Sequence, residues 1–359
     1  MRECFPLAVL GKGNVSPNPL VGAVLVKNGR TIASGYHEFY GGPHAEVNCL
    51  DGVKGNLRSA TLYVNLEPCA HHGKTPPCVD RIIRQGIGRV VVGMVDPNPL
   101  VRGHGIRKLR QAGVDVIVGV LENECRELNR IYIRHITLRR PYIHLKIAQS
   151  ADGRIAGPLG TNRWFTSLSS RKLVHAWRAE HDAVLVGART VRIDDPELTV
   201  RLAQGRDPDA IVIDGQLRVP EKAKLFRDLS KRRVLLVTSS EALKNSRDKV
   251  ARLSARGVIV LPFPSHLGHL SLVDILRGLY AHHIGSILVE GGAQVFSQFI
   301  EEGLFDQLSV FVAPKYFGRG LRALTPTVRR TAPGRSLRID RITAQDSGDD
   351  LLVQAFVNV

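Results

Sequence analysis

Short apolar runs alternate with amphipathic stretches over residues 21–120. The strand-like runs are VGAVLV, ATLYVNL, RVVVGMV and VDVIVGV, and the helix-like stretches between them are HAEVNCL, CVDRIIRQGI and GIRKLRQAG. This alternation is typical of a sheet covered by helices. Gly and Pro interrupt it where turns are needed, as in Pro17-Asn18-Pro19 and Asp96-Pro97-Asn98-Pro99.

A charged helical pattern over residues 122–134 and the basic RRPY at 139–142 follow this block. The alternation then resumes in the second half, with the runs YIHLKIA, DAVLVGA, AIVIDG, RVLLVTS, GVIVLPF, SILVEGG, LSVFVAP and LLVQAFV. A length of 359 residues suits two domains better than one. We therefore expect a linker helix before residue 140 and two α/β domains, at residues 1–140 and 141–359.

The composition excludes several classes of protein. Hydrophobic residues make up 43% and charged residues 23% of the chain, and no apolar run reaches the ~20 residues that a membrane span needs. The N-terminal stretch lacks a small-residue cleavage site after its apolar part, so we expect a cytoplasmic protein. Five cysteines, an odd number, suit metal ligands or core positions in a reducing compartment better than disulfides.

The charge balance points to anionic partners. The formal net charge is +17 and the isoelectric point is about 10.1. A surface of this kind attracts nucleic acid, and it equally attracts a phosphorylated small molecule. Charge alone does not choose between them.

A metal-binding pattern is the strongest chemical signal in the chain. His44 stands in Pro-His-Ala-Glu, Cys69 follows Glu67-Pro68, and Cys78 comes after eight intervening residues. An imidazole and two thiolates form a three-ligand zinc site whose fourth position is open to water, as catalytic zinc requires. We predict that His44, Cys69 and Cys78 bind Zn²⁺.

Glu46 is the predicted catalytic residue. Water on Zn²⁺ loses its proton near neutral pH, and a carboxylate that is not a ligand can carry this proton to a leaving amine. The pattern H-x-E followed by P-C-x-x-C is the signature of zinc deaminases that act on bases. This chain departs from it only between the cysteines, where AHHGKTPP replaces two residues.

These segments together resemble one family. VSPNPLVGAVLV at 15–26, GYH at 35–37, PHAEV at 43–47, NLEPCAHHGKTPPC at 65–78 and DPNPLVRGHG at 96–105 are similar to the pyrimidine deaminases of riboflavin biosynthesis. The resemblance implies a cytidine-deaminase-like α/β/α domain and a diaminohydroxy-pyrimidine substrate with a phosphoribosylamino group. It also implies that six residues line the substrate pocket: Asn18, His37, His71, Lys74, Asp96 and Asn98.

The second half lacks a G-x-G-x-x-G fingerprint for dinucleotides. Instead, VEGG at 289–292 joins an apolar strand to a helical stretch. A glycine pair in that place lets backbone N–H groups meet a pyrophosphate at the positive end of the helix dipole. Taken alone, the pair is equally a tight turn between strand and helix.

From residue 141 onward the chain resembles the reductase domain of bifunctional riboflavin-biosynthesis enzymes, whose α/β fold is similar to dihydrofolate reductase. The resemblance implies hydride transfer from NADPH that converts a ribosyl group into an open ribityl chain. The implied NADPH contacts are Ala148, Trp164, Thr190, Asp194, Gly215, Gly292, Ala293, Gln294, Val295, Phe296, Ser297 and Gln298. The implied substrate contacts are Asn162, Arg178, Leu198, Arg201 and Glu290. The guanidinium groups of Arg178 and Arg201 suit a phosphate.

Three alternatives stay open at this point. The chain could be a tRNA base deaminase, for which a charge of +17 is a natural footprint. It could also be a deaminase with a degenerate reductase domain, or an RNA-binding scaffold with structural zinc. Glu46 argues against the scaffold, because structural zinc needs a fourth protein ligand and no proton carrier. The expected enzyme acts on a phosphorylated pyrimidine, forms a homodimer or homotetramer, and binds neither nucleic acid nor membrane.

Overall fold

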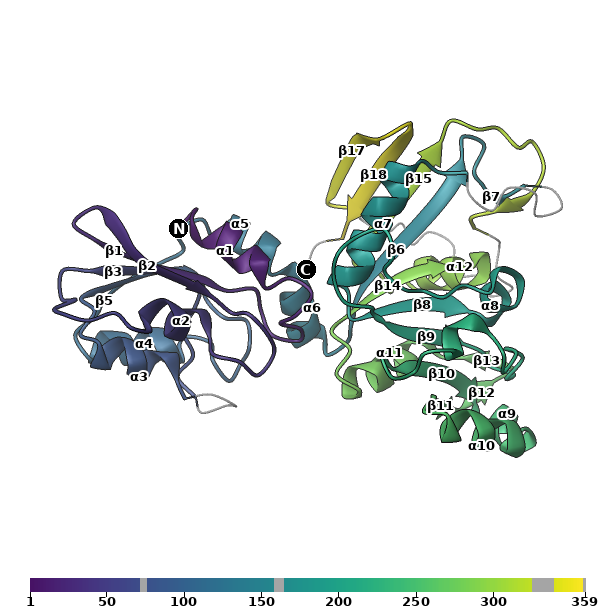
Figure 1. Ribbon diagram of the computed structural model, residues 1–359, viewed down its shortest axis with the longest axis horizontal. Coiled ribbons are helices and arrows are strands. Elements are labelled where there is room, and N and C mark those ends of the chain that lie inside the picture. Colours follow the sequence, from purple (N-terminus) through teal and green to yellow (C-terminus); the bar gives the residue numbers. More distant parts are fainter. Residues whose placement is uncertain (72–75, 158–164, 325–338, 358–359) are drawn as a thin grey trace. The chain divides into compact units, whose positions relative to one another are not determined.

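The computed structural model describes residues 1–71, 76–157, 165–324 and 339–357. Contacts within these residues divide the chain into two units, Met1–Arg139 and Arg140–Val359. Each unit has its own sheet and its own hydrophobic core (Figure 1). The α/β class predicted from the sequence is confirmed for both.

The first unit is built on a mixed sheet with the order β2-β1-β3-β4-β5. Strands β3, β4 and β5 run parallel, whereas β1 pairs antiparallel with both β2 and β3. The carboxyl ends of β3 and β4 therefore meet at one edge. The strands are β1 (Gly22–Lys27), β2 (Arg30–Tyr36), β3 (Thr61–Leu66), β4 (Arg89–Met94) and β5 (Asp115–Val118).

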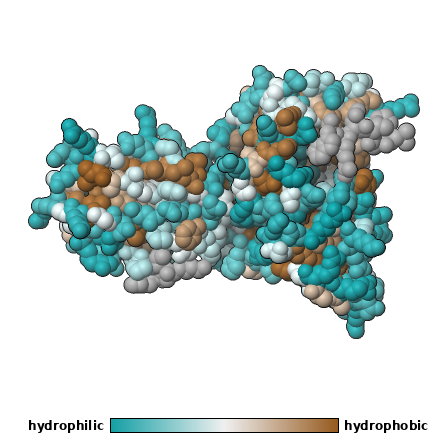
Figure 2. All heavy atoms as spheres, viewed as in Figure 1, coloured by the Kyte–Doolittle hydropathy of each residue, from teal (hydrophilic) through white to brown (hydrophobic). Residues whose placement is uncertain are grey.

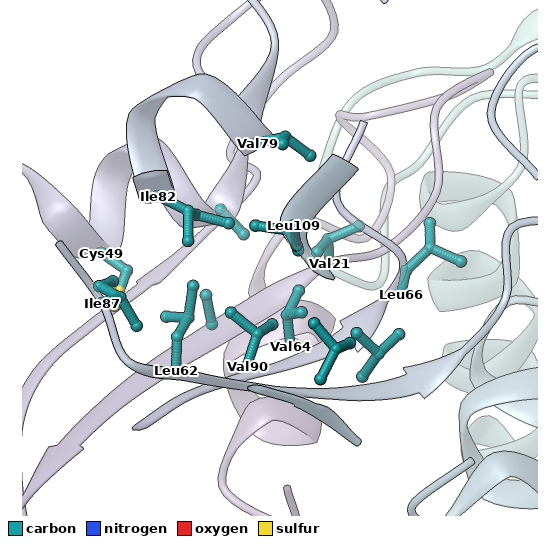
Figure 3. Close-up of a cluster of buried hydrophobic side chains, with 14 of the residues drawn as sticks. Val21, Cys49, Leu62, Val64, Leu66, Val79, Ile82, Ile87, Val90 and Leu109 are labelled. Carbon is teal, nitrogen blue, oxygen red and sulfur yellow. The ribbon is translucent and has the colours of Figure 1, made fainter. Parts of the chain in front are cut away.

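Helices cover both faces of this sheet (Figure 1). On one face, side chains from β3 and β4 such as Leu62 and Val90 pack against Cys49, Ile82 and Leu109 of three helices (Figure 3). The helices are α1 (Cys4–Leu10), α2 (Ala45–Leu50), α3 (Cys78–Arg84), α4 (His104–Gln111), α5 (Glu122–Leu128) and α6 (Arg130–Leu138). Of these, α2, α3 and α4 form the core shown in Figure 3.

The sequence predicts one linker helix, whereas the structure contains two, α5 and α6, which are separated at Asn129. The buried Asn129 side chain binds the backbone of Leu20, accepting from its N–H at 2.8 Å and donating to its carbonyl at 3.0 Å. These two bonds to a distant segment accompany the break, and they hold in place the chain segment that enters β1.

The second unit contains a nine-stranded sheet with the order β11-β10-β9-β8-β14-β6-β15-β18-β17. Strands from β11 to β15 in this order are parallel, and β18 and β17 close the sheet antiparallel. The strands are β6 (Tyr142–Ser150), β8 (Ala183–Gly187), β9 (Asp209–Ile213), β10 (Val234–Ser239), β11 (Ile259–Phe263), β14 (Ser286–Gly291), β15 (Gln307–Ala313), β17 (Arg341–Ser347) and β18 (Asp350–Phe356). Short pairs are formed by β7 (Arg154–Ala156) with β16 (Leu321–Arg322) and by β12 (Ser265–His266) with β13 (His269–Leu270).

Both faces of the central strands are buried. In β8, Ala183 and Leu185 belong to one core cluster and Val184 and Val186 to the other, as expected of a parallel strand covered on both sides. The helices are α7 (Leu168–Glu180), α8 (Ala188–Asp194), the 3₁₀ turn Lys224–Phe226, α9 (Ser240–Asn245), α10 (Arg247–Ala255), α11 (Leu272–Ala281) and α12 (Ala293–Glu301).

Two strands of the main sheets were missed by the sequence pattern because their side chains are mostly exposed. Strand β2 reads RTIASGY and β17 reads RITAQDS, and each buries a single residue fully. Strands at a sheet edge without a buried face show no apolar alternation. Figure 2 shows hydrophilic residues over much of the visible surface, with smaller hydrophobic patches between them. No helix within the described residues is long and apolar enough to cross a membrane.

A buried ion pair fastens the start of the second unit. Arg140 donates from Nη1 and Nη2 to the two Asp306 oxygens at 2.7 and 2.8 Å, and the Ile143 N–H donates to Asp306 Oδ2 at 2.7 Å. We predict that Asp306→Ala lowers the free energy of unfolding of this unit by ~3–5 kcal/mol, because the half-buried Arg140 guanidinium and the buried Ile143 N–H both lose this acceptor. Urea unfolding followed by circular dichroism measures the change.

The control for this prediction is Asp228→Ala. Asp228 pairs with Lys231 at 2.6 Å, but both side chains are exposed. Exposed pairs contribute little to stability, so this variant should unfold like the wild type. Equal effects of the two substitutions would contradict the role assigned to Asp306.

Candidate functional site

The three predicted metal ligands come together in the first unit. His44 caps the start of α2, Cys69 follows β3, and Cys78 is the first residue of α3. Their ligand atoms lie within 4.8 Å of one another. His44 Nδ1 is 3.2 Å from Cys78 Sγ and 3.5 Å from Cys69 Sγ. Tetrahedral Zn²⁺ with Zn–N of ~2.0 Å and Zn–S of ~2.3 Å holds such atoms ~3.5 Å apart, so the donor set fits zinc.

The protonation of the cluster also suits a metal. The hydrogen bond from Cys78, with a further one from His44, lowers the pKa of the Cys69 thiol to about 4. Because Cys78 holds the shared proton, its own pKa is raised. Thiolate, rather than thiol, is the form that binds metal. Cys69 is therefore prepared as a ligand before the ion arrives.

Glu46 lies beside this cluster on α2 and is 3% exposed. Burial, with a contribution from Cys69, raises the pKa of its carboxyl to about 7. A carboxyl of this kind takes up and releases a proton near neutral pH, which is the requirement for a general acid–base group. Glu46 is not one of the three clustered ligands.

His37 and Asn18 form a hydrogen-bonded pair close to the metal ligands. His37 Nδ1 donates to the Pro43 carbonyl at 2.9 Å, so its Nε2 is the acceptor for the Asn18 amide at 3.1 Å. Burial lowers the pKa of His37, which keeps the ring neutral. The His37 ring meets the His44 ring edge-on at 5.4 Å between centroids. The predicted substrate residue His37 is thus adjacent to the ligand His44, and the predicted substrate residue Asn18 is bonded to His37.

Asp96 and Asn98 lie in the loop after β4. Asp96 Oδ1 accepts from the Asn98 N–H at 2.8 Å and from the Tyr132 hydroxyl at 2.9 Å. Burial raises the pKa of the Asp96 carboxyl to about 6. Asn98 is only half-buried, and its Oδ1 accepts from the Leu100 N–H at 3.1 Å. His71 is exposed, and Lys74 lies outside the described residues.

Sequence reasoning missed two buried residues that organise this site. Glu67 accepts four backbone N–H groups from the loop after β4 and the start of α4. Asn65 donates to the Leu20 carbonyl at 2.9 Å and accepts from the Gly22 N–H at 2.8 Å. Both residues stand in the NLEPC segment that carries the resemblance, which is the signal that could have identified them.

In the second unit, the structure joins Arg178 of α7 to Glu290 of β14. Arg178 Nε and Nη2 donate to the two carboxylate oxygens at 2.5 and 2.7 Å, and Nη1 donates to the Thr199 carbonyl at 2.9 Å. Burial alone would raise the pKa of Glu290, but Arg178 beside it holds that pKa below its usual value. The family resemblance assigned Arg178 to a substrate phosphate. In the structure, its charge is instead balanced by Glu290 within the protein.

Two further ionisable residues surround this pair and were not predicted. Burial lowers the pKa of Lys146 on β6 and lowers that of His175 on α7 to about 4, and the charge of Arg178 acts in the same direction on both. His175 Nδ1 accepts from the Arg201 N–H at 2.9 Å. The Arg201 side chain is exposed and is paired with Glu197 at 2.8 Å. Leu198 is 2% exposed.

Some of the predicted cofactor contacts lie where β8 and β14 end. A Cβ on Gly292 would lie 3.1 Å from Thr190 Oγ1, and one on Gly187 would lie 3.0 Å from Val295 Cγ2. The glycines thus keep the start of α12 close to α8. Ala148 is half-buried on β6, Gly215 follows β9, and Asp194 ends α8. Asn162 and Trp164 lie outside the described residues.

The residues from Gly292 to Gln298 differ in whether they pack inside the unit or have N–H groups suited to an anion. The Phe296 N–H donates to the Gly292 carbonyl at 3.0 Å, and its side chain packs in the core. Ser297 is buried, and Gln298 donates to the Leu270 carbonyl at 3.3 Å. The first N–H groups of a helix lack acceptors within it, so Ala293, Gln294 and Val295 are the members suited to an anion.

Two family models match the chain, one in each unit. A model described as the cytidine and deoxycytidylate deaminase zinc-binding region matches residues 1–94. A second model, described as the RibD C-terminal domain, matches residues 141–353.

Similar curated proteins span almost the whole chain. Riboflavin biosynthesis protein RibD of Aquifex aeolicus is 44% identical over 98% of this chain and 96% of its own length. The protein of the same name from Escherichia coli is 38% identical over 90% of this chain and 89% of its own length.

Solved structures give the same result. The diaminohydroxyphosphoribosylaminopyrimidine deaminase/5-amino-6-(5-phosphoribosylamino)uracil reductase of Thermotoga maritima is 39% identical, with a TM-score of 0.86, over 100% of this chain and 97% of that one. Acinetobacter baumannii RibD is 32% identical, with a TM-score of 0.87, over 100% of this chain and 98% of that one.

His175 gives a test of the electrostatics in the second unit. An unfolded histidine ionises near pH 6.5, whereas burial lowers the pKa of His175 to about 4. Acidification from about pH 6.5 to pH 4 therefore protonates the unfolded chain first, and stability falls by at most ~1.4 kcal/mol per pH unit. We predict that urea unfolding of His175→Gln depends less on pH in this range than the wild type.

His266→Gln, at an exposed position, is the control and should keep the acid dependence of the wild type. If His175→Gln lost stability on acidification as steeply as this control, His175 would not be the residue kept neutral by the fold.

Proposed function

Because this chain belongs to the RibD family of bifunctional deaminase and reductase enzymes of riboflavin biosynthesis, we propose its substrates, cofactor and site residues. The first unit deaminates 2,5-diamino-6-(5-phosphoribosylamino)pyrimidin-4-one by hydrolysis. The second unit then reduces the ribosyl side chain of the product to ribityl with NADPH. The name of the Thermotoga maritima relative supports both substrates.

The observation that carries the proposed deamination is the cluster of His44, Cys69 and Cys78 with Glu46 buried beside it. Zinc, when bound there, supplies Lewis acidity toward the attacking water. Glu46 takes a proton from that water and delivers it to the amine, which leaves as ammonia. Because its pKa of about 7 lies near the working pH, Glu46 can perform both transfers.

The polar residues around the cluster are proposed to hold the pyrimidine. The neutral His37 and the Asn18 amide lie on the His44 side of the site, and Asp96 and Asn98 come from the loop after β4. His71 and Lys74 belong to the same proposal through the family resemblance alone. A fixed set of donors and acceptors orients the ring so that its amine meets the nucleophile.

NADPH supplies the hydride for the reduction, and the protein mainly positions the two reactants. We assign the cofactor phosphates to the N–H groups that begin α12, next to Thr190, with Ala148, Trp164, Asp194 and Gly215 as further contacts. Glu290 stays ionised through Arg178, so the pair offers the substrate a fixed polar surface. Arg201, whose guanidinium is exposed, is the better candidate for the ribose phosphate, and Asn162 and Leu198 belong to the proposed substrate contacts through the family resemblance alone.

RibD relatives match both units, which disfavours a tRNA deaminase and an RNA-binding scaffold. A degenerate reductase remains to be tested by the assay below. We further propose a cytoplasmic homo-oligomer, a dimer or tetramer, that binds neither nucleic acid nor membrane.

The role of Glu46 predicts a selective loss of activity. Glu46→Gln should reduce the deamination rate ~10²–10⁴-fold, since it removes a general acid–base group. Zinc content, measured by metal analysis, should equal that of the wild type. Reduction of the deaminated intermediate by the same sample should be unchanged. Glu124→Gln, at an exposed position of α5, is the matched control.

Deamination by Glu46→Gln at the wild-type rate, with zinc bound, would exclude the proposed role. Loss of zinc in this variant would instead make Glu46 a support of the metal site.

The reductase assignment predicts a defect in cofactor binding. A Cβ on Gly292 would lie 3.1 Å from Thr190 Oγ1, so Gly292→Ala places a methyl group tightly against Thr190 at the start of α12. We expect the KM for NADPH to rise ~10- to 10²-fold while deamination is unaffected. The measurement is absorbance at 340 nm with the deaminated intermediate. No NADPH oxidation by the wild type would indicate a degenerate reductase, and an unchanged KM would place the cofactor elsewhere.

A further inference from the structure

Glu67 is a buried carboxylate for which the proposed chemistry has no use. It directly follows β3, and Pro68 alone separates it from the metal ligand Cys69. The residue is 3% exposed, and its N–H donates to the Met94 carbonyl at the end of β4 at 3.0 Å. Glu67 thus lies where two parallel strands end, between the metal ligands and the loop after β4.

Four backbone N–H groups satisfy this carboxylate. Oε2 accepts from Asp96 at 3.2 Å and Gly103 at 2.9 Å, and Oε1 accepts from Gly105 at 3.0 Å and Ile106 at 3.2 Å. Among the described residues, no Lys or Arg pairs with Glu67 within 4 Å. The charge of Glu67 is therefore balanced by N–H dipoles and by the positive end of α4.

These bonds fix both ends of one loop. Asp96 begins it, and Gly103 with the first residues of α4 ends it. Asn98 lies between them, and its N–H donates to Asp96 Oδ1 at 2.8 Å. The start of α4 also presses against the metal-binding turn, since a Cβ on Gly105 would lie 1.9 Å from the Pro68 carbonyl oxygen.

We infer that Glu67 is a positioning residue for the deamination, which holds the Asp96–Asn98 loop in register with the metal ligand Cys69. The inference rests on the proposed function, because it takes Asp96 and Asn98 as substrate contacts. Glu67 is not one of the three clustered ligands, and both of its carboxylate oxygens accept from N–H groups of the loop and of α4, so it acts through the loop. Contacts made equally in the ground state and the transition state govern KM more than kcat.

The test uses the full-length zinc enzyme with Glu67→Gln, which keeps the size of the side chain. The amide nitrogen faces two backbone N–H groups that need an acceptor, so the loop loses half of its anchors. We expect the KM for the pyrimidine to rise ~10- to 10²-fold with a much smaller change in kcat. Zinc content and the reductase rate should match the wild type, and Glu67→Asp, which restores the charge, should lie between the two.

Amide hydrogen exchange reports the mechanism directly. Exchange at Gly103, Gly105 and Ile106 should be faster in Glu67→Gln, because their acceptor is weakened. Glu124→Gln, exposed on α5, is the matched control and should resemble the wild type in every measurement. An unchanged KM in Glu67→Gln overturns the inference. Loss of zinc, or failure of the first unit to fold in both Glu67 variants, also overturns it and makes Glu67 a purely structural residue.

Asn98→Ala separates this inference from the proposed function. A raised KM in Asn98→Ala together with an unchanged KM in Glu67→Gln would leave the substrate contact intact and reject the role of Glu67. An unchanged KM in Asn98→Ala with a raised KM in Glu67→Gln would reject Asn98 as a contact, while Glu67 would still act through Asp96.

Discussion

Parallel pairing of strands is the constraint on which both sites depend. In a parallel sheet the carboxyl ends of neighbouring strands meet at one edge, and the loops that leave them converge there. In the first unit, β3 leads to Glu67 and Cys69, and β4 leads to Asp96. In the second unit, β8 leads to Thr190 and β14 ends at Glu290 and Gly291. Residues far apart in sequence become neighbours because hydrogen bonding aligns the strands that carry them.

Three buried carboxylates show how the fold separates chemistry from support. Glu67 is surrounded by four N–H donors, and Glu290 is held by a two-bond pair with Arg178. Glu46 has no comparable set of partners to offset its burial, so burial raises its pKa to about 7. A carboxylate with strong partners is a fixed anchor, whereas one left poorly compensated can exchange a proton. The environment, more than the residue type, assigns these roles.

The sequence predicted what depends on local pattern. Apolar runs located the central strands, and the spacing of His44, Cys69 and Cys78 predicted a cluster that the structure brings within 4.8 Å. What it missed depends on remote partners. Glu67 and Asn129 accept hydrogen bonds from backbone N–H groups of distant segments, and since nearly every residue has such a group, the sequence does not indicate which one a side chain binds. Exposed edge strands such as β17 were missed because no buried face imposes a period of two. The pairing of Arg178 with Glu290 needed α7 and β14 to be placed first.

The separate cores determine how the two activities can be studied. The core around β3 and β4 contains only residues of the first unit, and both clusters around β6 and β8 contain only residues of the second. A packing defect affects the atoms that lose their neighbours, so its effect stays within one cluster. A substitution at the metal site can therefore be judged against the reductase rate of the same molecule. That internal standard corrects for the amount of enzyme whose second unit is folded, while zinc content reports whether the first unit is folded, so the two together separate a catalytic or positioning effect from a loss of folded protein.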